Sequence, residues 1–230
     1  MAKNNQSLAQ RNNIIRASVM GANDGILSVS GIVIGVAGAT TNPFSILIAG
    51  FAGALAGTVS MAMGEYVSVH SQNDAQKKAE ATQEKRLQQN YADEFDFVKD
   101  KYIAEGVPAT LAIQATQEMM EADPLGTTIR ERYGFTLHQE MSAISAGIAS
   151  MISFPLGSIL PMLAISLVTA QNHMNVWATA VSVAIALAIT GYLAAKLSGA
   201  NLYKATLRNV IAGIFTMIIT YGIGTLIGGI

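Results

Sequence analysis

The sequence predicts an all-α integral membrane protein with five transmembrane helices and a helical cytoplasmic insert between the second and third. Three observations predict this class. Of the 230 residues, 51% are hydrophobic and 13% are charged, whereas soluble domains contain about 25% charged residues. All but two of the 15 acidic residues lie between positions 74 and 140. Five segments outside that region are apolar over about 20 residues, which is the length that a helix needs to cross a bilayer.

The predicted spans follow a polar N-terminal arm that lacks the apolar core and cleavage site of a signal peptide. They cover approximately positions 17–39, 44–67, 142–168, 176–195 and 209–230. Small residues recur in them, as in "GFAGALAGTVSMAMG", and such residues allow membrane helices to approach closely. Pro155 and Pro161 lie inside the third span, where neighbouring helices can satisfy the freed carbonyls.

The basic residues predict the orientation. All 14 fall on one side of the five-span arrangement, and the loops "TTNP" and "TAQNHMN" contain none. Because Lys and Arg accumulate in cytoplasmic loops, we expect the N-terminus and the insert inside and the C-terminus outside. Short loops suit a bacterial plasma membrane. The chain then divides into the arm with the first two spans (1–70), the insert (71–140) and the last three spans (141–230).

The insert is rich in good helix formers. We expect one long helix that breaks near Asn90 and ends at Gly106, since glycine commonly follows a helix C-terminus. Pro108 suits the first turn of the next helix, and Pro124 ends it. A shorter helix is expected over positions 127–134.

Two carboxylates, Asp24 and Glu65, lie within predicted spans, and such residues are costly and typical of functional sites. Counted from the turn "TTNP", Asp24 and Met61 lie at similar depth. Glu65 follows Met61 by four residues and shares its face. A carboxylate beside a thioether suits a transition-metal cation better than Mg²⁺ or Ca²⁺. A buried carboxylate can also exchange a metal ion for a proton. We therefore predict a metal site at these three residues.

Each of these residues has a simpler interpretation. Asp24 could cap a helix that begins at "NDG". Glu65 could be a solvated glutamate at the membrane surface. Met61 could only fill space in the core, as methionine readily does.

The insert holds five further candidate metal ligands. Glu80 and Glu84 are four residues apart, Glu94 neighbours two aspartates, and "EMME" contains Glu118 and Glu121. Helices carrying such pairs could gather carboxylates around divalent cations. The alternative is a solvated helix face with nearby lysines.

Several functions are excluded by composition. The chain has no cysteine, so it has no thiolate metal site and no catalytic thiol. No nucleophile–base arrangement or phosphate-binding loop is apparent, so we expect neither an enzyme nor a permanently bound cofactor. A net charge of −1 gives no basic field for nucleic acid.

The stretches "MGANDGILSVSGIVIGVAGA", "SMAMGEYVSVHSQNDA" and "SFPLGSILPMLA" together resemble the vacuolar iron transporter (VIT) family, and "MGEYVS" is similar to bacterial-type members. The resemblance implies a homodimer that exports Fe²⁺, or in some members Mn²⁺, from the cytosol in exchange for protons. It also implies that the insert binds metal. Asp24 and Met61 match the Asp and Met of the family's translocation path, and Glu94 matches an insert glutamate.

The sequence also departs from the family pattern. The plant vacuolar form has a glutamate two turns before the span-2 methionine, where this chain has Gly53. Its insert has a Met pair where this chain has Thr128 and Ile129.

These observations predict a transporter that moves Fe²⁺ or Mn²⁺ out of the cytoplasm by proton antiport. Its expected partners are divalent metal ions, protons, the lipid bilayer and a second copy of the chain. The alternative is a membrane-anchored metal sensor or store that acts through the acidic insert. A scaffold for a soluble partner would leave Asp24 unexplained.

Overall fold

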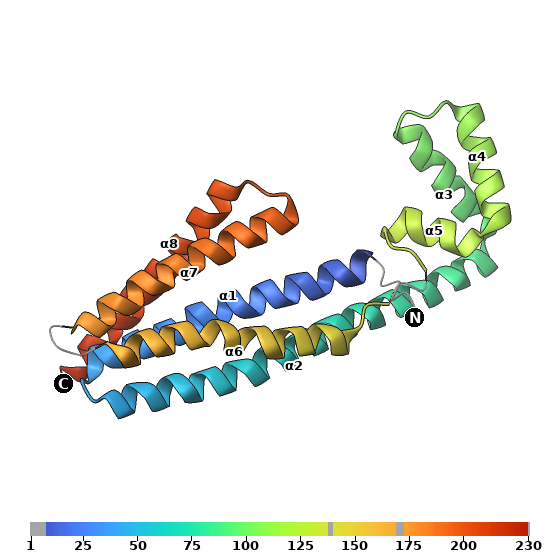
Figure 1. Ribbon diagram of the computed structural model, residues 1–230. Helices are drawn as coiled ribbons and strands as arrows, with labels where there is room; N and C mark the ends of the chain where they lie inside the picture. Colours follow the sequence, from blue (N-terminus) through green and yellow to red (C-terminus); the bar gives the residue numbers. More distant parts are fainter. Residues whose placement is uncertain (1–7, 138–139, 169–172, 230) are drawn as a thin grey trace, which may run out of the picture. The chain divides into compact units, whose positions relative to one another are not determined.

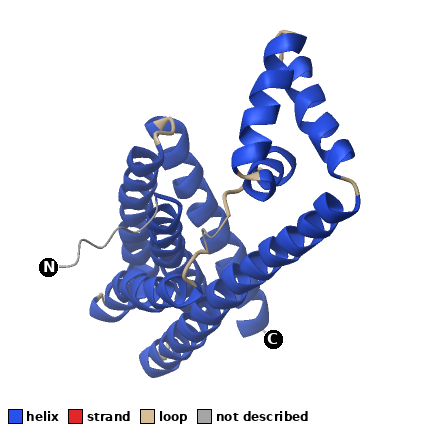
Figure 2. Ribbon diagram, turned by 90° about the vertical axis from the view of Figure 1, so that its right-hand side faces the viewer, coloured by secondary structure: helices blue, strands red, loops and turns tan. Residues whose placement is uncertain are grey.

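The computed structural model describes residues 8–137, 140–168 and 173–229, and these fold into helices and loops without a strand (Figure 2). The helices are α1 (Leu8–Ala39), α2 (Pro43–Gln89), α3 (Tyr91–Ala104), α4 (Ala109–Ala122), α5 (Pro124–Tyr133), α6 (Ala143–Leu167), α7 (Met174–Ser198) and α8 (Leu202–Gly228). They form two units. The membrane bundle comprises Leu8–Val67 and Ser142–Ile230, and the insert comprises Ser68–Met141.

Five helices in the described residues are long and apolar enough to cross a membrane, namely α1, α2, α6, α7 and α8. This confirms the predicted all-α membrane fold with five spans. The first helix begins at Leu8, earlier than the predicted position 17, because "AQRNNIIRAS" contains no Pro or Gly to end it. The predicted end at position 230, and part of the loop before α7, lie outside the described residues.

Helix α1 lies at the centre of the bundle, between α6 on one side and the α7–α8 hairpin on the other (Figure 1). Its Val29 and Val33 are fully buried and belong to one apolar core with Phe154 of α6 and Leu187 of α7. This packing fixes which faces of α1 point toward protein.

The contact between α1 and α6 depends on glycine. A Cβ added to Gly157 would lie 2.1 Å from the carbonyl oxygen of Ala22, and one added to Gly25 would lie 2.1 Å from that of Phe154. Real side chains cannot occupy such positions. The two backbones therefore approach as closely as small-residue packing in membranes allows.

Helix α2 is a single helix of 47 residues that runs without a break from the membrane bundle into the insert. Nothing in "SVHSQNDAQKKAEATQEKR" interrupts the backbone, since good helix formers follow the apolar part directly. The expected break occurs where predicted. Asn90 accepts a hydrogen bond from the backbone N–H of Asp93 and caps α3.

The other helices of the insert begin and end at glycine and proline residues. Gly106 has φ +97° after the end of α3, as predicted. Pro108 precedes α4, and Pro124 is the first residue of α5, whose N-terminus is capped by Asp123. The buried apolar residues of this unit are Val98, Ala112, Met120 and Ile129.

Candidate metal-binding site

Four residues spaced four apart form a stripe that winds slowly around α1, which we call the α1 stripe: Arg16, Met20, Asp24 and Ser28. Residues at this spacing are neighbours on a helix. Nη1 of Arg16 lies 3.2 Å from Sδ of Met20, and the Ser28 hydroxyl donates to Oδ1 of Asp24 at 2.7 Å. Polar and soft side chains thus continue from the start of α1 into its middle.

Asp24 is the carboxylate of this stripe, and it is half-buried in the middle of α1. The interpretation of Asp24 as a helix cap is therefore wrong. Among the described residues Asp24 forms no ion pair, and Ser28 donates the one hydrogen bond found at its carboxylate. A charge with so little compensation inside a membrane helix is expensive.

Helix α2 runs antiparallel to α1, and two contacts fix the register. Arg16 pairs with Glu65, and Ile32 packs against Gly53, where an added Cβ would meet its Cδ1. Asp24 is midway between Arg16 and Ile32, so it is level with the midpoint of the α2 segment, near residue 59. Met61 is then within about 3 Å of the level of Asp24 along the helix axis, which supports the depth predicted from the sequence.

Met61 itself is partly buried and packs against the apolar core. Its side chain contributes to packing, as the simpler interpretation held, and its sulfur is the soft atom closest in depth to Asp24. Its role as a metal ligand stays a prediction.

Glu65 is buried, with 6% of its side chain exposed. Its Oε1 lies 2.9 Å from Nη2 of Arg16, and the same nitrogen donates to Oε2 at 3.1 Å. The interpretation of Glu65 as a solvated surface glutamate is therefore wrong. In the sequence Arg16 is one of the charges that predict the orientation, although its spacing of eight residues from Asp24 also places the two on the same side of a helix.

A second polar cluster forms around Asn23, the residue before Asp24 in α1. Oδ1 of Asn23 accepts hydrogen bonds from Asn209 of α8 at 3.1 Å and from Thr190 of α7 at 3.3 Å. No local pattern in the sequence indicates this cluster, because Thr190 and Asn209 are 167 and 186 residues away from Asn23. It connects three helices by polar contacts inside the bundle.

Glu94 in the insert has a different environment. It is 7% exposed, and its Oε2 accepts hydrogen bonds from Gln83 at 2.6 Å and from Arg132 at 2.9 Å. The Arg132 guanidinium also stacks on Phe97, 3.7 Å from the ring centre. This carboxylate connects α2, α3 and α5.

Glu131, which is not among the candidate ligands predicted from the sequence, is the centre of a similar cluster. Lys101 and Tyr102 donate to its two carboxylate oxygens at 2.9 and 2.8 Å, and Arg130 donates at 3.1 Å. Burial opposes ionisation, but these three hydrogen bonds outweigh it and lower the pKa of Glu131. Burial, together with the hydrogen bond to Glu131, raises the pKa of Tyr102.

The other candidate ligands of the insert lie on helix surfaces. Glu84, Glu118 and Glu121 are exposed and Glu80 is half-exposed. Gln114 donates to Glu118 at 3.0 Å and Gln117 to Glu121 at 2.9 Å. In the described part of the chain, no three His, Cys, Asp or Glu side chains lie close enough together to hold a metal ion. Metal binding by these glutamates stays a prediction.

Comparison with known proteins gives the family. The model of the VIT family matches residues 15–225. The chain belongs to the VIT family. It is 30% identical over 214 residues to vacuolar iron transporter homolog 1 of Arabidopsis thaliana, covering 93% of this chain and 83% of the plant protein. It is 32% identical over 212 residues to the vacuolar iron transporter of Acanthamoeba castellanii, covering 92% and 78%. The VIT family is a family of transporters, as predicted, and not of enzymes.

The departures from the VIT pattern have structural counterparts. Gly53 faces Ile32 of α1 at close range, so a glutamate there would displace that side chain. Thr128 and Ile129 are fully buried in the insert, and the Thr128 hydroxyl donates to the carbonyl of Pro124 at 2.8 Å. In this VIT protein the two positions belong to the core of the insert.

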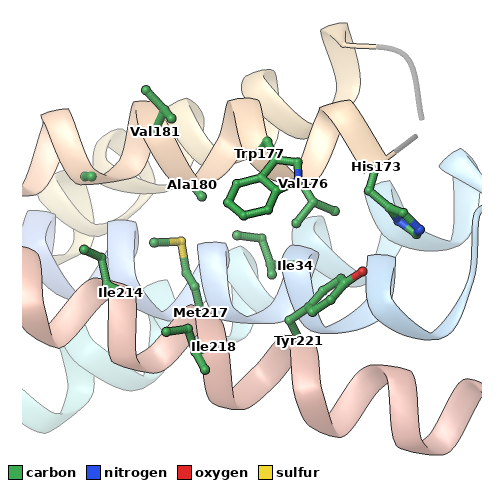
Figure 3. Close-up of a pocket in the computed structure, with 11 residues that line it drawn as sticks. Ile34, His173, Val176, Trp177, Ala180, Val181, Ile214, Met217, Ile218 and Tyr221 are labelled. Atoms are coloured by element: carbon green, nitrogen blue, oxygen red, sulfur yellow. The ribbon is translucent and has the colours of Figure 1, made fainter. Parts of the chain in front are cut away.

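A cavity of about 470 Å³ lies between α1, α7 and α8, and no residue of the α1 stripe lines it (Figure 3). Trp177 and Met217 face into it, and His173 and Tyr221 lie at one end (Figure 3). The described side chains that line it include no carboxylate, so its chemistry does not suit a divalent cation.

Proposed function

We propose that this VIT protein moves a divalent transition-metal ion, Fe²⁺ or Mn²⁺, from the cytoplasm to the opposite side of its membrane in exchange for protons. One observation carries this proposal. Asp24 is an ionisable side chain in the middle of a membrane helix, with a single hydroxyl as its partner among the described residues. Relatives named as vacuolar iron transporters support the choice of iron.

The proposed chemistry uses two properties of the site. In apolar surroundings a carboxylate is costly as a bare anion, so it favours either a proton or a cation. The two occupants exclude each other, which couples metal movement to proton movement in the opposite direction. The Met61 thioether, near the level of Asp24, favours a transition metal over Mg²⁺. The metal is the cargo in this scheme and not a resident cofactor.

The direction and the assembly belong to the same proposal. The distribution of Lys and Arg supports a cytoplasmic N-terminus and insert, and the short loops suit a bacterial plasma membrane. Only 17% of the residues in the most apolar stretch of α2 are buried. Its exposed face presents Phe44, Leu47, Phe51, Leu55 and Val59. Either lipid or a second copy can cover such a face, and we propose a homodimer.

A sensor or store acting through the insert is the second candidate. It would require the insert glutamates to bind metal. Glu94, the candidate that best matches the family, is already occupied by Arg132 and Gln83. We therefore place transport first.

The test is metal flux into proteoliposomes that contain a metal-quenched dye and a pH dye. Wild type is compared with Asp24→Asn and with Asp100→Asn, a matched control because Asp100 is 69% exposed in the insert. We expect Fe²⁺ or Mn²⁺ uptake with opposite proton movement in wild type and the control. Asp24→Asn should lower the flux by at least about 100-fold, since no carboxylate remains at the middle of α1 to take either ion.

Full flux in Asp24→Asn would show that the ion does not pass Asp24. Absence of flux in wild type with Fe²⁺, Mn²⁺ and Zn²⁺, combined with metal binding that depends on the insert glutamates, would favour the sensor or store.

A further inference from the structure

The guanidinium of Arg16 is surrounded by acceptor atoms from three side chains. Beside both oxygens of Glu65, at 2.9 and 3.1 Å, it meets Oδ1 of Asn13 at 3.0 Å and Sδ of Met20 at 3.2 Å. A carboxylate, an amide oxygen and a thioether thus converge on one cationic group. They come from two helices, α1 and α2.

This set of donors would also suit a metal ion. Carboxylate and amide oxygens ligate hard divalent cations, and a thioether shifts the preference toward softer transition metals. The Arg16 guanidinium occupies the place where these donors meet. The structure therefore shows what a cation at this position would touch.

Glu65 has an unused acceptor in this arrangement. Its Oε1 is buried and receives no hydrogen bond of acceptable geometry from any described residue, although Nη2 of Arg16 is 2.9 Å away. Buried polar atoms without a hydrogen bond are uncommon in proteins. Arg16 neutralises the charge of Glu65 but leaves one of its oxygens free to accept another ligand.

The two partners differ in their freedom to move. Arg16 is 48% exposed and Glu65 is 6% exposed. The long arginine side chain can turn into solvent, whereas the carboxylate stays inside the bundle. Removal of Arg16 without a replacement would leave a buried charge unpaired, so exchange with another cation is the favoured way to separate them.

The group of side chains around Arg16 is also on the same part of α1 as Asp24. Arg16, Met20 and Asp24 are successive members of the α1 stripe, and Asp24 is about 12 Å further along the helix axis than Arg16. Met20 lies between them and contacts Arg16. An ion held by Glu65 and Met20 would be on the face that Asp24 occupies.

We propose that Asn13, Met20 and Glu65 form an entry site for a divalent transition-metal ion, and that Arg16 is a tethered competitor that fills this site until a metal ion displaces it. The inference rests on the proposed transport function for the destination of the ion. The competition between Arg16 and metal can be tested by binding alone. If Arg16 only ties α1 to α2, its removal will change stability and leave metal affinity unchanged.

The first experiment measures Mn²⁺ binding to the full-length protein in detergent micelles, from the loss of the free-ion EPR signal. Arg16→Gln removes the competitor and keeps a polar side chain. If Arg16 leaves the site free about a tenth of the time, its removal tightens Mn²⁺ binding about tenfold. The matched control is Arg11→Gln, which removes the same charge from an exposed position on α1 and should change affinity less than about twofold.

The double variant Arg16→Gln/Glu65→Gln should lose the gain in affinity, because the central ligand is absent. Arg16→Lys keeps the positive charge without the planar fork and should bind Mn²⁺ with intermediate affinity; it also serves if Arg16→Gln does not fold. The proposal is overturned if Arg16→Gln binds no more tightly than Arg11→Gln, or if the gain persists without Glu65.

A second measurement separates this proposal from the proposed transport function. In Arg16→Gln/Asp24→Asn the tighter Mn²⁺ binding should remain even though flux is lost. In proteoliposomes, Arg16→Gln should lower the Mn²⁺ concentration for half-maximal flux by the same factor as it lowers the dissociation constant for Mn²⁺. Failure of wild type to transport would contradict the transport function only, whereas unchanged affinity in Arg16→Gln would contradict the competitor only.

Discussion

Asp24 in the membrane bundle and Glu94 in the insert are both carboxylates within helical units, but their partners differ. Glu94 receives hydrogen bonds from Arg132 and Gln83, whereas Asp24 receives one from Ser28. The insert compensates its buried charges with cations from its own helices. The bundle leaves Asp24 almost uncompensated and is held together instead by apolar packing and close backbone approach. The pairing of Glu94 stabilises the insert, whereas Asp24 has no cation of the described residues beside it and is available for an ion that arrives from outside.

The largest expected effect is in the insert. Arg132→Met removes the cation that neutralises Glu94 and should destabilise the insert by about 3 kcal/mol, because a buried charge is left unpaired. The measurement is thermal unfolding of the full-length protein, followed by circular dichroism and by limited proteolysis between α2 and α6. The double variant Glu94→Gln/Arg132→Met should recover much of the loss. Equal stability of Arg132→Met and wild type would contradict the role assigned to this pair.

In the membrane bundle, stability should depend most on the close approach of the α1 and α6 backbones. Gly157→Ala forces a Cβ against the backbone of α1 and should cost about 2 kcal/mol, as overpacking of a tight contact does. Gly64→Ala is the control, because a Cβ there meets nothing within 4 Å. It should be neutral or stabilise α2 by up to about 1 kcal/mol. The stability of both variants is measured by thermal unfolding in detergent. Equal changes in the two variants would show that the close approach of α1 and α6 does not limit stability.

A matched pair of substitutions tests the comparison directly. Asp24→Asn removes an uncompensated charge and should stabilise the bundle by about 1 kcal/mol, at the cost of transport. Glu94→Gln removes a compensated charge and should destabilise the insert by about 1 kcal/mol, since Arg132 loses its partner. Both are measured by thermal unfolding without added metal. Effects of the same sign would contradict the distinction drawn between the two carboxylates.

The smallest effect concerns pH. The hydrogen bonds at Glu131 outweigh burial and lower its pKa below the ordinary value of 4.5. A lowered folded-state pKa contributes stability above pH 4.5, and that contribution is lost as the pH falls through the folded-state value. The insert should therefore lose stability below about pH 4.5, and Glu131→Gln should show a flatter profile. Glu105→Gln, at an exposed position, should follow the wild-type profile in the same unfolding series.

The sequence alone determined the helices of this protein. Apolar segments of sufficient length gave the five spans, and Asn90 and Gly106 gave the break and the end of α3. These features are local, because capping, glycine conformation and hydropathy depend on a few neighbouring residues. The sequence also identified Asp24 as unusual, since a charge in an apolar segment is visible without a structure.

The tertiary structure alone decided which charges are compensated. Arg16 and Glu65 are separated by 49 positions, and Glu94 and Arg132 by 38. Nothing in the local sequence distinguishes these carboxylates from exposed ones such as Glu84. Packing of the helices brings partners together and excludes water, and that environment determines which carboxylates have a cation of the chain beside them and which do not.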